Sequence, residues 1–256
     1  MISTYLQGGL GNYMFQIAAA EALAIDLGTK SVFDFNLASQ VHKNIRSYQD
    51  NIFNEINDIS GVRFQSKYSE QGFGYQDLPK TTSLYLIGYF QSEKYFKNHC
   101  THIKSVFSAT PETQDMVYRK YSDIFYGVVC SIHVRRGDYL KLQDHHPVLG
   151  MQYYNEAIDK VVADKYLIFS DDIEWCKQNF IGDQFIFIEG EPDYVDMFLM
   201  SLCDHNIIAN SSFSWWGAWL NSDDDKIVVA PENWFGPAKG DINTSDLIPE
   251  KWIKIV

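Results

Sequence analysis

Apolar runs alternate with amphipathic stretches along the chain, most regularly in its second half. Short runs rich in β-branched and aromatic residues predict strands, and longer runs with apolar residues three and four apart predict helices. Strands that alternate with helices form a parallel, doubly wound sheet. We expect strands at 128–134, 166–169, 185–188, 206–209 and 226–230, with helices at 151–162, 174–176, 194–203 and 215–220.

The first half is less regular, but its start predicts a βαβ unit: a strand at 2–6, a glycine turn at 8–12, a helix at 14–27 and a strand at 32–35. A strand at 83–90 and helices at 91–106 and 111–122 follow. The pattern between Gln40 and Lys80 is weak and indicates irregular surface structure or part of an acceptor site. We therefore expect two α/β domains, 1–125 and 126–256, with the boundary near 123–127.

Composition and charge limit the classes of partner. The chain has 256 residues, of which 46% are hydrophobic and 15% aromatic, enough for a substantial core. Its 21 Lys and Arg residues against 33 Asp and Glu residues give a formal charge of -12. This balance argues against nonspecific binding to nucleic acid or to an anionic membrane.

Cysteine usage and hydropathy favour the cytoplasm. The four cysteines form no CxxC pair and lie mostly in apolar runs, which is typical of buried free thiols in a reducing compartment. No apolar run approaches the ~20 residues that span a bilayer. The start, MISTYLQGGLGN, lacks the charged region and apolar core of a signal peptide.

The stretch 128–139, VVCSIHVRRGDY, concentrates charge at the end of a predicted strand. Because side chains alternate along a strand, His133 and Arg135 share one face and Arg136 takes the other. Ligands of α/β proteins bind at the carboxyl ends of parallel strands, so we expect His133 and Arg135 in a crevice there. Arg136 is expected to pair with Asp138 and hold the turn, where Gly137 allows the bend.

Two other predicted strands end in polar clusters that should reach the same edge of the sheet. One cluster is Asp171-Asp172, and the other is Asn210-Ser211-Ser212, which opens a helix without acidic residues in its first turn. Amides at such a helix N-terminus can bind an anion, and a serine can also cap the helix. An arginine opposite this helix predicts a phosphate or diphosphate site. Asp171 or Asp172 then accepts hydrogen bonds from a base or ribose, or caps the next helix.

Three other sites are weaker. Gly9-x-Gly11 with Asp34 suggests dinucleotide binding, but Met14 replaces the third glycine of that motif. His99 and His102 lie three apart without a further metal ligand near them in sequence, so ordinary histidines are favoured. No GxxxxGK[ST] loop is present. We expect no metal site.

Several sequence strings occur in an order that resembles the α-1,2-fucosyltransferases of glycosyltransferase family eleven. The similarity runs nearly end to end, with Tyr13 standing where the family usually has glutamine. The strings are GGLGNYMFQIA at 8–18, HVRRGDY at 133–139, FSDDIEWC at 169–176, NSSFSWWGAWL at 210–220 and the closing PENWF and IPEKWIKI.

The resemblance implies a GT-B-like fold of two Rossmann-like domains facing a cleft. It also implies GDP-L-fucose as donor, a glycan acceptor, inversion at the sugar carbon, and no metal or other cofactor. Contact with a lipid-linked acceptor at a membrane surface is a further option. The implied substrate-binding residues are Gly9, Gly11, Asn12, His133, Arg135, Arg136, Asp171, Asp172, Asn210, Ser211, Ser212 and Phe213.

Within that set, the resemblance assigns Arg135 to the donor diphosphate as the catalytic arginine. Ser211, Ser212 and Phe213 would line the phosphates. His133 with Asp171 or Asp172 would face the guanosine, and Asn12 would approach the diphosphate or the fucose from the first domain.

The general base is left open among Asp138, His145 and His146. Three other functions also stay open: a transferase with a different nucleotide-sugar donor, a nucleotide- or sugar-binding module without catalysis, and an NAD-dependent enzyme.

Overall fold

The chain divides into two α/β units in a computed structural model that describes residues 1–41 and 45–256. The first unit holds Met1–Thr110 with Asn243–Pro249. The second holds Pro111–Ile242 with Glu250–Val256. The part of the predicted irregular region that covers residues 42–44 lies outside the described residues.

Helix α5 (Pro111–Tyr121) opens the second unit. Val117 and Tyr121 of this helix pack into a core with Leu167 and Phe169 of the sheet. The division between the units therefore falls before α5, whereas the sequence pattern suggested a boundary after it, near 123–127.

The second unit is built on a parallel sheet of six strands in the order β6-β5-β4-β7-β8-β9. This order matches a doubly wound sheet, because β4 lies inside it and the chain moves outward in both directions. The strands are β4 (Val129–Val134), β5 (Lys165–Ser170), β6 (Phe185–Phe187), β7 (His205–Ile207), β8 (Val228–Pro231) and β9 (Ile253–Ile255).

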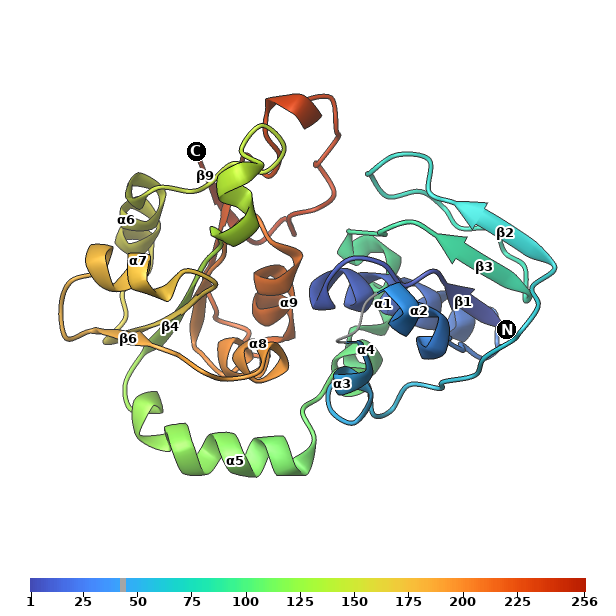
Figure 1. The fold of residues 1–256 in the computed structure, drawn as a ribbon, viewed down its shortest axis with the longest axis horizontal. Helices are drawn as coiled ribbons and strands as arrows, with labels where there is room; N and C mark the ends of the chain where they lie inside the picture. The colour runs from blue at the N-terminus through green and yellow to red at the C-terminus, as the bar shows by residue number, and fades with distance from the viewer. Residues whose placement is uncertain (42–44) are drawn as a thin grey trace. The chain divides into compact units, whose positions relative to one another are not determined.

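Helices cover both faces of this sheet (Figure 1). On one face, α6 and α7 pack against Ile132 and Val134 of β4. On the other, α5, α8 and the start of α9 pack near Val129 and Leu167. The four later helices are α6 (Met151–Lys160), α7 (Ile173–Asn179), α8 (Asp193–Ser201) and α9 (Ser212–Leu220).

The first unit contains a parallel sheet of three strands in the order β1-β3-β2, namely β1 (Ile2–Thr4), β2 (Ser66–Ser69) and β3 (Leu84–Ile87). Its longest helix, α1, is buried on nearly every side, as expected for a helix rich in alanine and apolar residues. The helices of this unit are α1 (Leu10–Asp26), α2 (Phe35–Val41), α3 (Ile45–Gln49) and α4 (Cys100–Val106).

The βαβ prediction for the first unit was wrong in its second strand. Ser31 and Phe33 form only isolated bridges, to Ile2 and Asp58, and helix α2 begins at Phe35. Asp34 explains the early helix start, because its Oδ1 accepts a hydrogen bond from Leu37 N at 2.8 Å in the manner of a helix cap. Asp34 therefore has a structural role in place of the ribose contact that a dinucleotide site would need.

The predicted helix at 91–106 was also wrong over its first half. Phe90 has a positive φ of 52°, and two 3₁₀ turns precede α4. His99 Nε2 lies 2.7 Å from Asp26 Oδ1, and His102 Nε2 lies 3.3 Å from Glu21 Oε2. Each histidine thus contacts a carboxylate of α1.

The cysteines and the helices answer two other expectations. Cys130, Cys176 and Cys203 are buried free thiols as predicted, whereas Cys100 is exposed. Within 1–41 and 45–256, no helix combines the length and the apolar character needed to cross a membrane.

Asn206, which is fully buried on β7, ties three segments of the second unit together. Its Nδ2 donates to Ser131 Oγ at 2.7 Å and to Met200 O at 2.8 Å, and its Oδ1 accepts from Asn221 Nδ2 at 2.9 Å. Replacing it would leave buried polar groups without partners. Such groups are costly because they lose water without gaining a new partner.

We expect Asn206→Ala to lower the free energy of unfolding of the second unit by about 3 kcal/mol. All six tryptophans lie in that unit, so urea unfolding followed by tryptophan fluorescence reports on it. Asn179→Ala is the control, because Asn179 makes one hydrogen bond, to Trp175 O at the end of α7. Equal losses in the two variants would contradict this role for Asn206.

Candidate active site

Three loops meet at the carboxyl edge of the six-stranded sheet. Strand β4 pairs in parallel with β5 and with β7, in a register that sets His133 opposite Phe169 and Ile132 opposite Ile207. The residues after all three strands therefore reach one edge, as the sequence predicted. That edge is where an α/β sheet binds its ligands.

Arg135 stands at the centre of this edge with its side chain 33% exposed. Its Nη2 donates to Asp138 Oδ1 at 2.6 Å, and its Nη1 forms an ion pair with Asp171 Oδ2 at 2.8 Å. The guanidinium carbon also lies 5.1 Å from the centre of the Tyr139 ring. Arg135 is thus an accessible cation held by two carboxylates and one aromatic face.

Arg136 has a different set of partners and a side chain only 15% exposed. Its Nε donates to Asp172 Oδ2 at 3.0 Å, and its guanidinium carbon lies 4.1 Å from the Trp175 ring centre. These contacts place it on the α7 side of the sheet, opposite to Arg135. The two arginines therefore have different partners, as expected from alternation along the strand.

The expected pair between Arg136 and Asp138 was wrong. Strand β4 ends at Val134, and Gly137–Lys141 forms a 3₁₀ turn. The turn bends the chain directly after the two arginines, and Asp138 Oδ1 accepts from Arg135 Nη2. Asp138 therefore faces Arg135, not Arg136.

Asp171 and Asp172 have different contacts, and Asp172 takes the capping role that the sequence left open. Asp172 caps α7, with Oδ1 accepting from Trp175 N at 3.3 Å. Asp171 Oδ1 accepts from Arg136 N at 2.8 Å, and a Cβ on Gly137 would lie 2.4 Å from Asp171 Oδ2. Only glycine therefore leaves room for Asp171 to reach Arg135.

His133 is buried beside the start of α9. The residue is 6% exposed, and its ring centre lies 5.4 Å from that of Phe213. Burial, followed by the charge of Arg135, lowers the pKa of His133 to about 3, so the ring is neutral at physiological pH. Among the described residues, its Nδ1 has no hydrogen-bond partner, which marks it as a polar atom able to contact a ligand.

The N-terminus of α9 combines a neutral cap with an uncompensated helix dipole. Ser211 Oγ accepts from Phe213 N at 3.3 Å, which confirms the cap, and the first turn holds no acidic residue. The Asn210 side chain is 1% exposed and donates to Pro147 O at 3.0 Å and Trp234 O at 3.2 Å. Asn210 thus anchors the loops around the helix start, while Ser211, Ser212 and Phe213 form the opening turn.

The predicted site residues of the first unit surround the start of α1. Gly9 is the N-cap of α1, so the helix begins at Leu10, before the predicted start at 14. Asn12 Oδ1 accepts from Gln91 Nε2 at 2.6 Å. The positive φ of this turn belongs to Gly8, at 91°, rather than to Gly9 or Gly11. Gly8 also approaches Asn12 so closely that a Cβ would lie 2.3 Å from Asn12 Nδ2.

The three candidate bases occupy different surroundings. Asp138 is exposed and paired with Arg135, and His145 is exposed on its loop. His146 stacks on Tyr139 with ring centres 4.7 Å apart, and Lys239 Nζ lies 3.1 Å from its Nε2. Partial burial, followed by the charge of Lys239, lowers the pKa of His146. His146 is therefore part of a packed layer of rings.

Asp196, in the first turn of α8, is a candidate that the sequence interpretation missed. Burial, followed by the charges of Glu191 and Asp193, raises its pKa to about 7. Its Oδ1 has no partner in the described part of the chain. It adjoins Val195, which packs on the same face of the sheet as Val129 of β4. Because side chains alternate along a strand, His133 lies on that face too. The sequence feature that could have identified it is an acidic residue in the first turn of a helix that begins at the carboxyl edge of the sheet.

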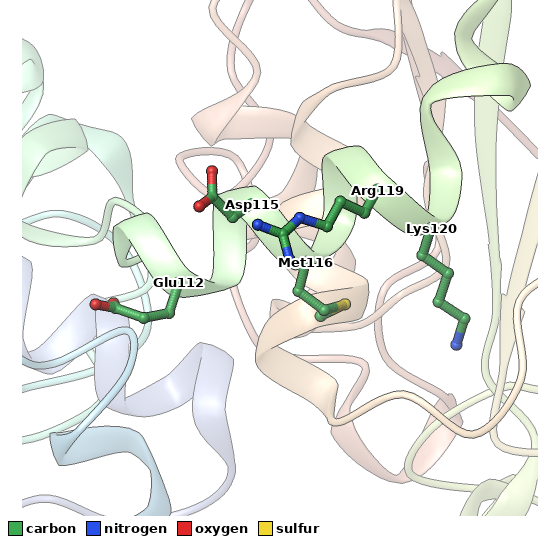
Figure 2. Close-up of a pocket in the computed structure, with 5 residues that line it drawn as sticks. All are labelled: Glu112, Asp115, Met116, Arg119 and Lys120. Atoms are coloured by element: carbon green, nitrogen blue, oxygen red, sulfur yellow. The ribbon is translucent and has the colours of Figure 1, made fainter.

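Neither the metal-ligating side chains of the described residues nor the hollow on α5 adds a residue to this edge. Across residues 1–41 and 45–256, three or more His, Cys, Asp or Glu side chains nowhere gather as a metal-binding group. A hollow of about 490 Å³ is lined by α5 alone, and Figure 2 shows its side chains projecting from that helix. Its lining residues are Glu112, Asp115, Met116, Arg119 and Lys120. None of them follows a strand of the sheet, so the hollow is no candidate for the site.

Comparison with known proteins connects this geometry to carbohydrate transfer. The model of glycosyl transferase family 11 matches residues 1–255. An α-1,2-colitosyltransferase of Escherichia coli is 33% identical, over 98% of this chain and 97% of the relative. A galactoside α-(1,2)-fucosyltransferase 1 of Ateles belzebuth is 26% identical, over 86% of this chain and 65% of the relative.

Solved structures support the fold. The α-1,6-fucosyltransferase NodZ of Bradyrhizobium, soaked with GDP-fucose, matches with a TM-score of 0.56 at 14% identity. The match covers 86% of this chain and 92% of NodZ. The GT-B-like α/β class expected from the sequence is thereby confirmed.

His133 should make the stability of the second unit depend on pH. With a pKa of about 3 when folded and 6.5 as the ordinary value, it binds a proton only after unfolding at intermediate pH. Its contribution to the free energy of unfolding should therefore fall as pH drops from about 6 to about 4, by at most about 1.4 kcal/mol per pH unit. Asp196 acts in the opposite direction, because its pKa is raised on folding.

The test compares wild type with His133→Asn, so that the Asp196 contribution cancels. Urea unfolding followed by tryptophan fluorescence at pH 7, 6, 5 and 4 should show the stability advantage of wild type shrinking with acidity. A stability difference that stays constant over this range would contradict a neutral, buried His133.

Proposed function

Because this chain belongs to glycosyltransferase family 11, we propose that it transfers L-fucose from GDP-L-fucose to the 2-hydroxyl of a galactoside. The product would carry an α-1,2 linkage, formed with inversion at the sugar carbon. The family match over residues 1–255 is the observation that carries this proposal. Names of relatives support it further, since one is a galactoside α-(1,2)-fucosyltransferase and another an α-1,2-colitosyltransferase.

The sheet edge offers the charge that a nucleoside diphosphate sugar requires. Arg135 is an accessible cation, and α9 opens with a neutral cap and no acidic residue in its first turn. Guanidinium groups and helix N-termini both favour phosphate oxygens. We therefore assign the diphosphate to Arg135 and to the opening turn at Ser211, Ser212 and Phe213.

The proposed reaction breaks the bond between the anomeric carbon of fucose and the β-phosphate oxygen of GDP. A bond forms between that carbon and the acceptor oxygen, and the acceptor hydroxyl gives its proton to a base. Negative charge grows on the departing GDP as the first bond breaks. Fixed donors that face this charge lower the barrier, and the loss of one commonly costs about 3 kcal/mol.

Arg135 must exchange partners for this chemistry. Its guanidinium donates to Asp138 and forms an ion pair with Asp171. A diphosphate would bind to Nη1, to Nη2 or to both, which would release the carboxylate at that nitrogen. Asp138 released in this way is the proposed base, since it is exposed beside the arginine and its carboxylate would be free to accept the proton.

The guanine of the donor would bind at the carboxyl edge of the sheet, on the side of His133. His133 and Asp196 both hold polar atoms without partners among the described residues. Guanine presents N–H donors along its edge, which a carboxylate accepts well. We assign these two residues to the base, with Asp171 and Asp172 closer to the arginines.

A second donor has specific support. One relative with 33% identity over 98% of this chain is named an α-1,2-colitosyltransferase. Donors that differ by a single hydroxyl are separated only by a pocket whose own polar groups pair with that hydroxyl. GDP-colitose is therefore the alternative donor to test first.

A donor panel tests the proposal. Purified protein is given GDP-fucose, GDP-colitose or UDP-galactose with a set of β-galactosides, and nucleotide release and product linkage are measured. We expect GDP release and an α-1,2 product with GDP-fucose. Faster turnover with GDP-colitose would move the assignment to that donor. Binding of GDP-fucose without turnover on any acceptor would instead support a noncatalytic binding module.

Arg135→Ala should lower kcat/KM for the donor by at least about a hundredfold, because it removes the cation that faces the departing diphosphate. Initial rates of GDP release measure this. Arg119→Ala is the matched control, since Arg119 is exposed on α5 in the same unit. Wild-type rates in purified Arg135→Ala protein would refute the assignment.

Ser212→Pro tests the backbone amide at the start of α9. Ser212 is the first helical residue, where proline is tolerated, and Ser211 before it has the extended conformation that proline requires. Removing this amide should weaken GDP binding about tenfold to a hundredfold, as expected for a hydrogen bond to a charged group. Titration calorimetry with GDP measures the change.

Ser212→Ala provides the comparison at the same position, because it removes the hydroxyl and keeps the amide. We expect it to bind GDP within about threefold of wild type, since a neutral hydroxyl contributes less than a charged hydrogen bond. If both variants lose affinity equally, the hydroxyl and not the amide contacts the phosphate.

A further inference from the structure

Tyr139, which follows the two arginines in sequence, contacts three parts of the site. Its ring lies under Arg135, with the guanidinium carbon 5.1 Å from the ring centre. Its hydroxyl donates to the carbonyl oxygen of Asn210, at the start of α9, over 3.2 Å. On another side it stacks on His146 with an angle of 22° between the rings. One side chain thus joins the proposed diphosphate arginine to the proposed anion-binding helix.

The layer of rings continues behind Tyr139. His146 also contacts Phe235, with ring centres 5.7 Å apart, and Lys239 donates to its Nε2. Backbone hydrogen bonds hold the two loops together, from Gly236 N to His145 O at 3.0 Å and from Ala238 N to Asp144 O at 2.8 Å.

Gly236 permits this close approach of the loops. A Cβ at this position would lie 2.5 Å from the carbonyl oxygen of Asp144, and backbone cannot move aside as a flexible side chain can. The layer behind Tyr139 is therefore held by backbone contacts as well as by rings. Tyr139 has little freedom to move when Arg135 changes its partners.

A bound anion would compete with the two carboxylates that contact Arg135, but not with the ring of Tyr139. Asp138 and Asp171 lie beside the guanidinium nitrogens, whose N–H groups a diphosphate also needs. Tyr139 instead presents its ring to the group, with the guanidinium carbon 5.1 Å from the ring centre. An aromatic face and an anion can hold one guanidinium at the same time, since they use different parts of it.

We propose that Tyr139 is a positioning residue, which holds the guanidinium of Arg135 in register with the α9 N-terminus while the carboxylates are exchanged for the donor diphosphate. This proposal rests on the proposed function, because it takes Arg135 as the diphosphate ligand. Tyr139 itself does not contact the reacting atoms. Its effect should appear in donor binding and should pass through Arg135.

The test measures the donor KM, kcat and the affinity for GDP in Tyr139→Leu, Tyr139→Phe and Tyr139→Trp. We expect Tyr139→Leu to weaken GDP binding and raise the donor KM about tenfold, the loss expected for a desolvated cation–π contact. Tyr139→Phe keeps the ring and loses the bond to Asn210, so a change of about threefold is expected. Tyr139→Trp should restore most of the affinity, because it restores an aromatic face.

Tyr153→Phe is the control for a purely structural effect. The Tyr153 hydroxyl donates to Ile208 O at 2.6 Å, two residues before Asn210, but Tyr153 is buried among other core residues. Tyr153→Phe should lower the melting temperature and leave the donor KM unchanged. If Tyr139→Leu shows that same pattern, Tyr139 is structural and the proposal is overturned.

A double-mutant cycle on GDP binding separates this proposal from the proposed function. In an Arg135→Ala background, Tyr139→Leu should cause no further loss of GDP affinity, because the residue acts through Arg135. Additive losses would overturn the proposal even if fucose transfer is confirmed. Nonadditive losses in a protein that transfers no fucose would uphold the positioning role and reject the proposed reaction.

Discussion

The parallel pairing of β4 on both sides is the constraint on which the site depends. All six residues of the strand are buried, and β5 and β7 fix its register. A shift of one residue would exchange the two faces of the strand and move His133 from the α8 side to the α6 side. Burial on both faces therefore fixes where Arg135 leaves the sheet.

Two neighbouring arginines show how burial separates roles within one motif. Arg136 is mostly covered, stacked on Trp175 and bonded to Asp172, so it joins the turn to α7. Arg135 keeps more contact with solvent and makes its ion pairs with partly exposed carboxylates. Ion pairs of that kind contribute little to stability, so they can be exchanged for a ligand at small cost.

Helices α7 and α9 both begin at this edge, and their caps differ in charge. Helix α7 begins with the carboxylate of Asp172, which compensates its dipole, whereas α9 begins with the neutral cap of Ser211. A neutral cap satisfies backbone donors without cancelling the positive potential. Of these two helices, α9 is therefore the one suited to an anion, and it is the one that Tyr139 connects to Arg135.

Strong periodicity explains which elements could be predicted. The strands β4 and β5 and the helices α5, α6 and α8 follow from clear apolar patterns within a few residues. Short elements were missed, such as β2 in the irregular region and β9 near the C-terminus. In the first unit, the Asp34 cap and the turn at Phe90 overrode apolar runs that resembled a strand and a long helix. Local polar contacts of this kind do not change the spacing of apolar residues, so periodicity does not reveal them.

The sequence by itself determined the α/β class, the convergence of three strand ends and the placement of Arg135 and Arg136 on opposite sides, because alternation along a strand and parallel pairing are local rules. Tertiary structure decided which carboxylate faces which arginine. Asp138 turned to Arg135 because the chain left the strand in a 3₁₀ turn. Tertiary structure also decided that His146 packs on Tyr139 and that Asp196 Oδ1 has no hydrogen-bond partner among the described residues. These depend on how distant loops and helices pack, which no spacing within a single segment encodes.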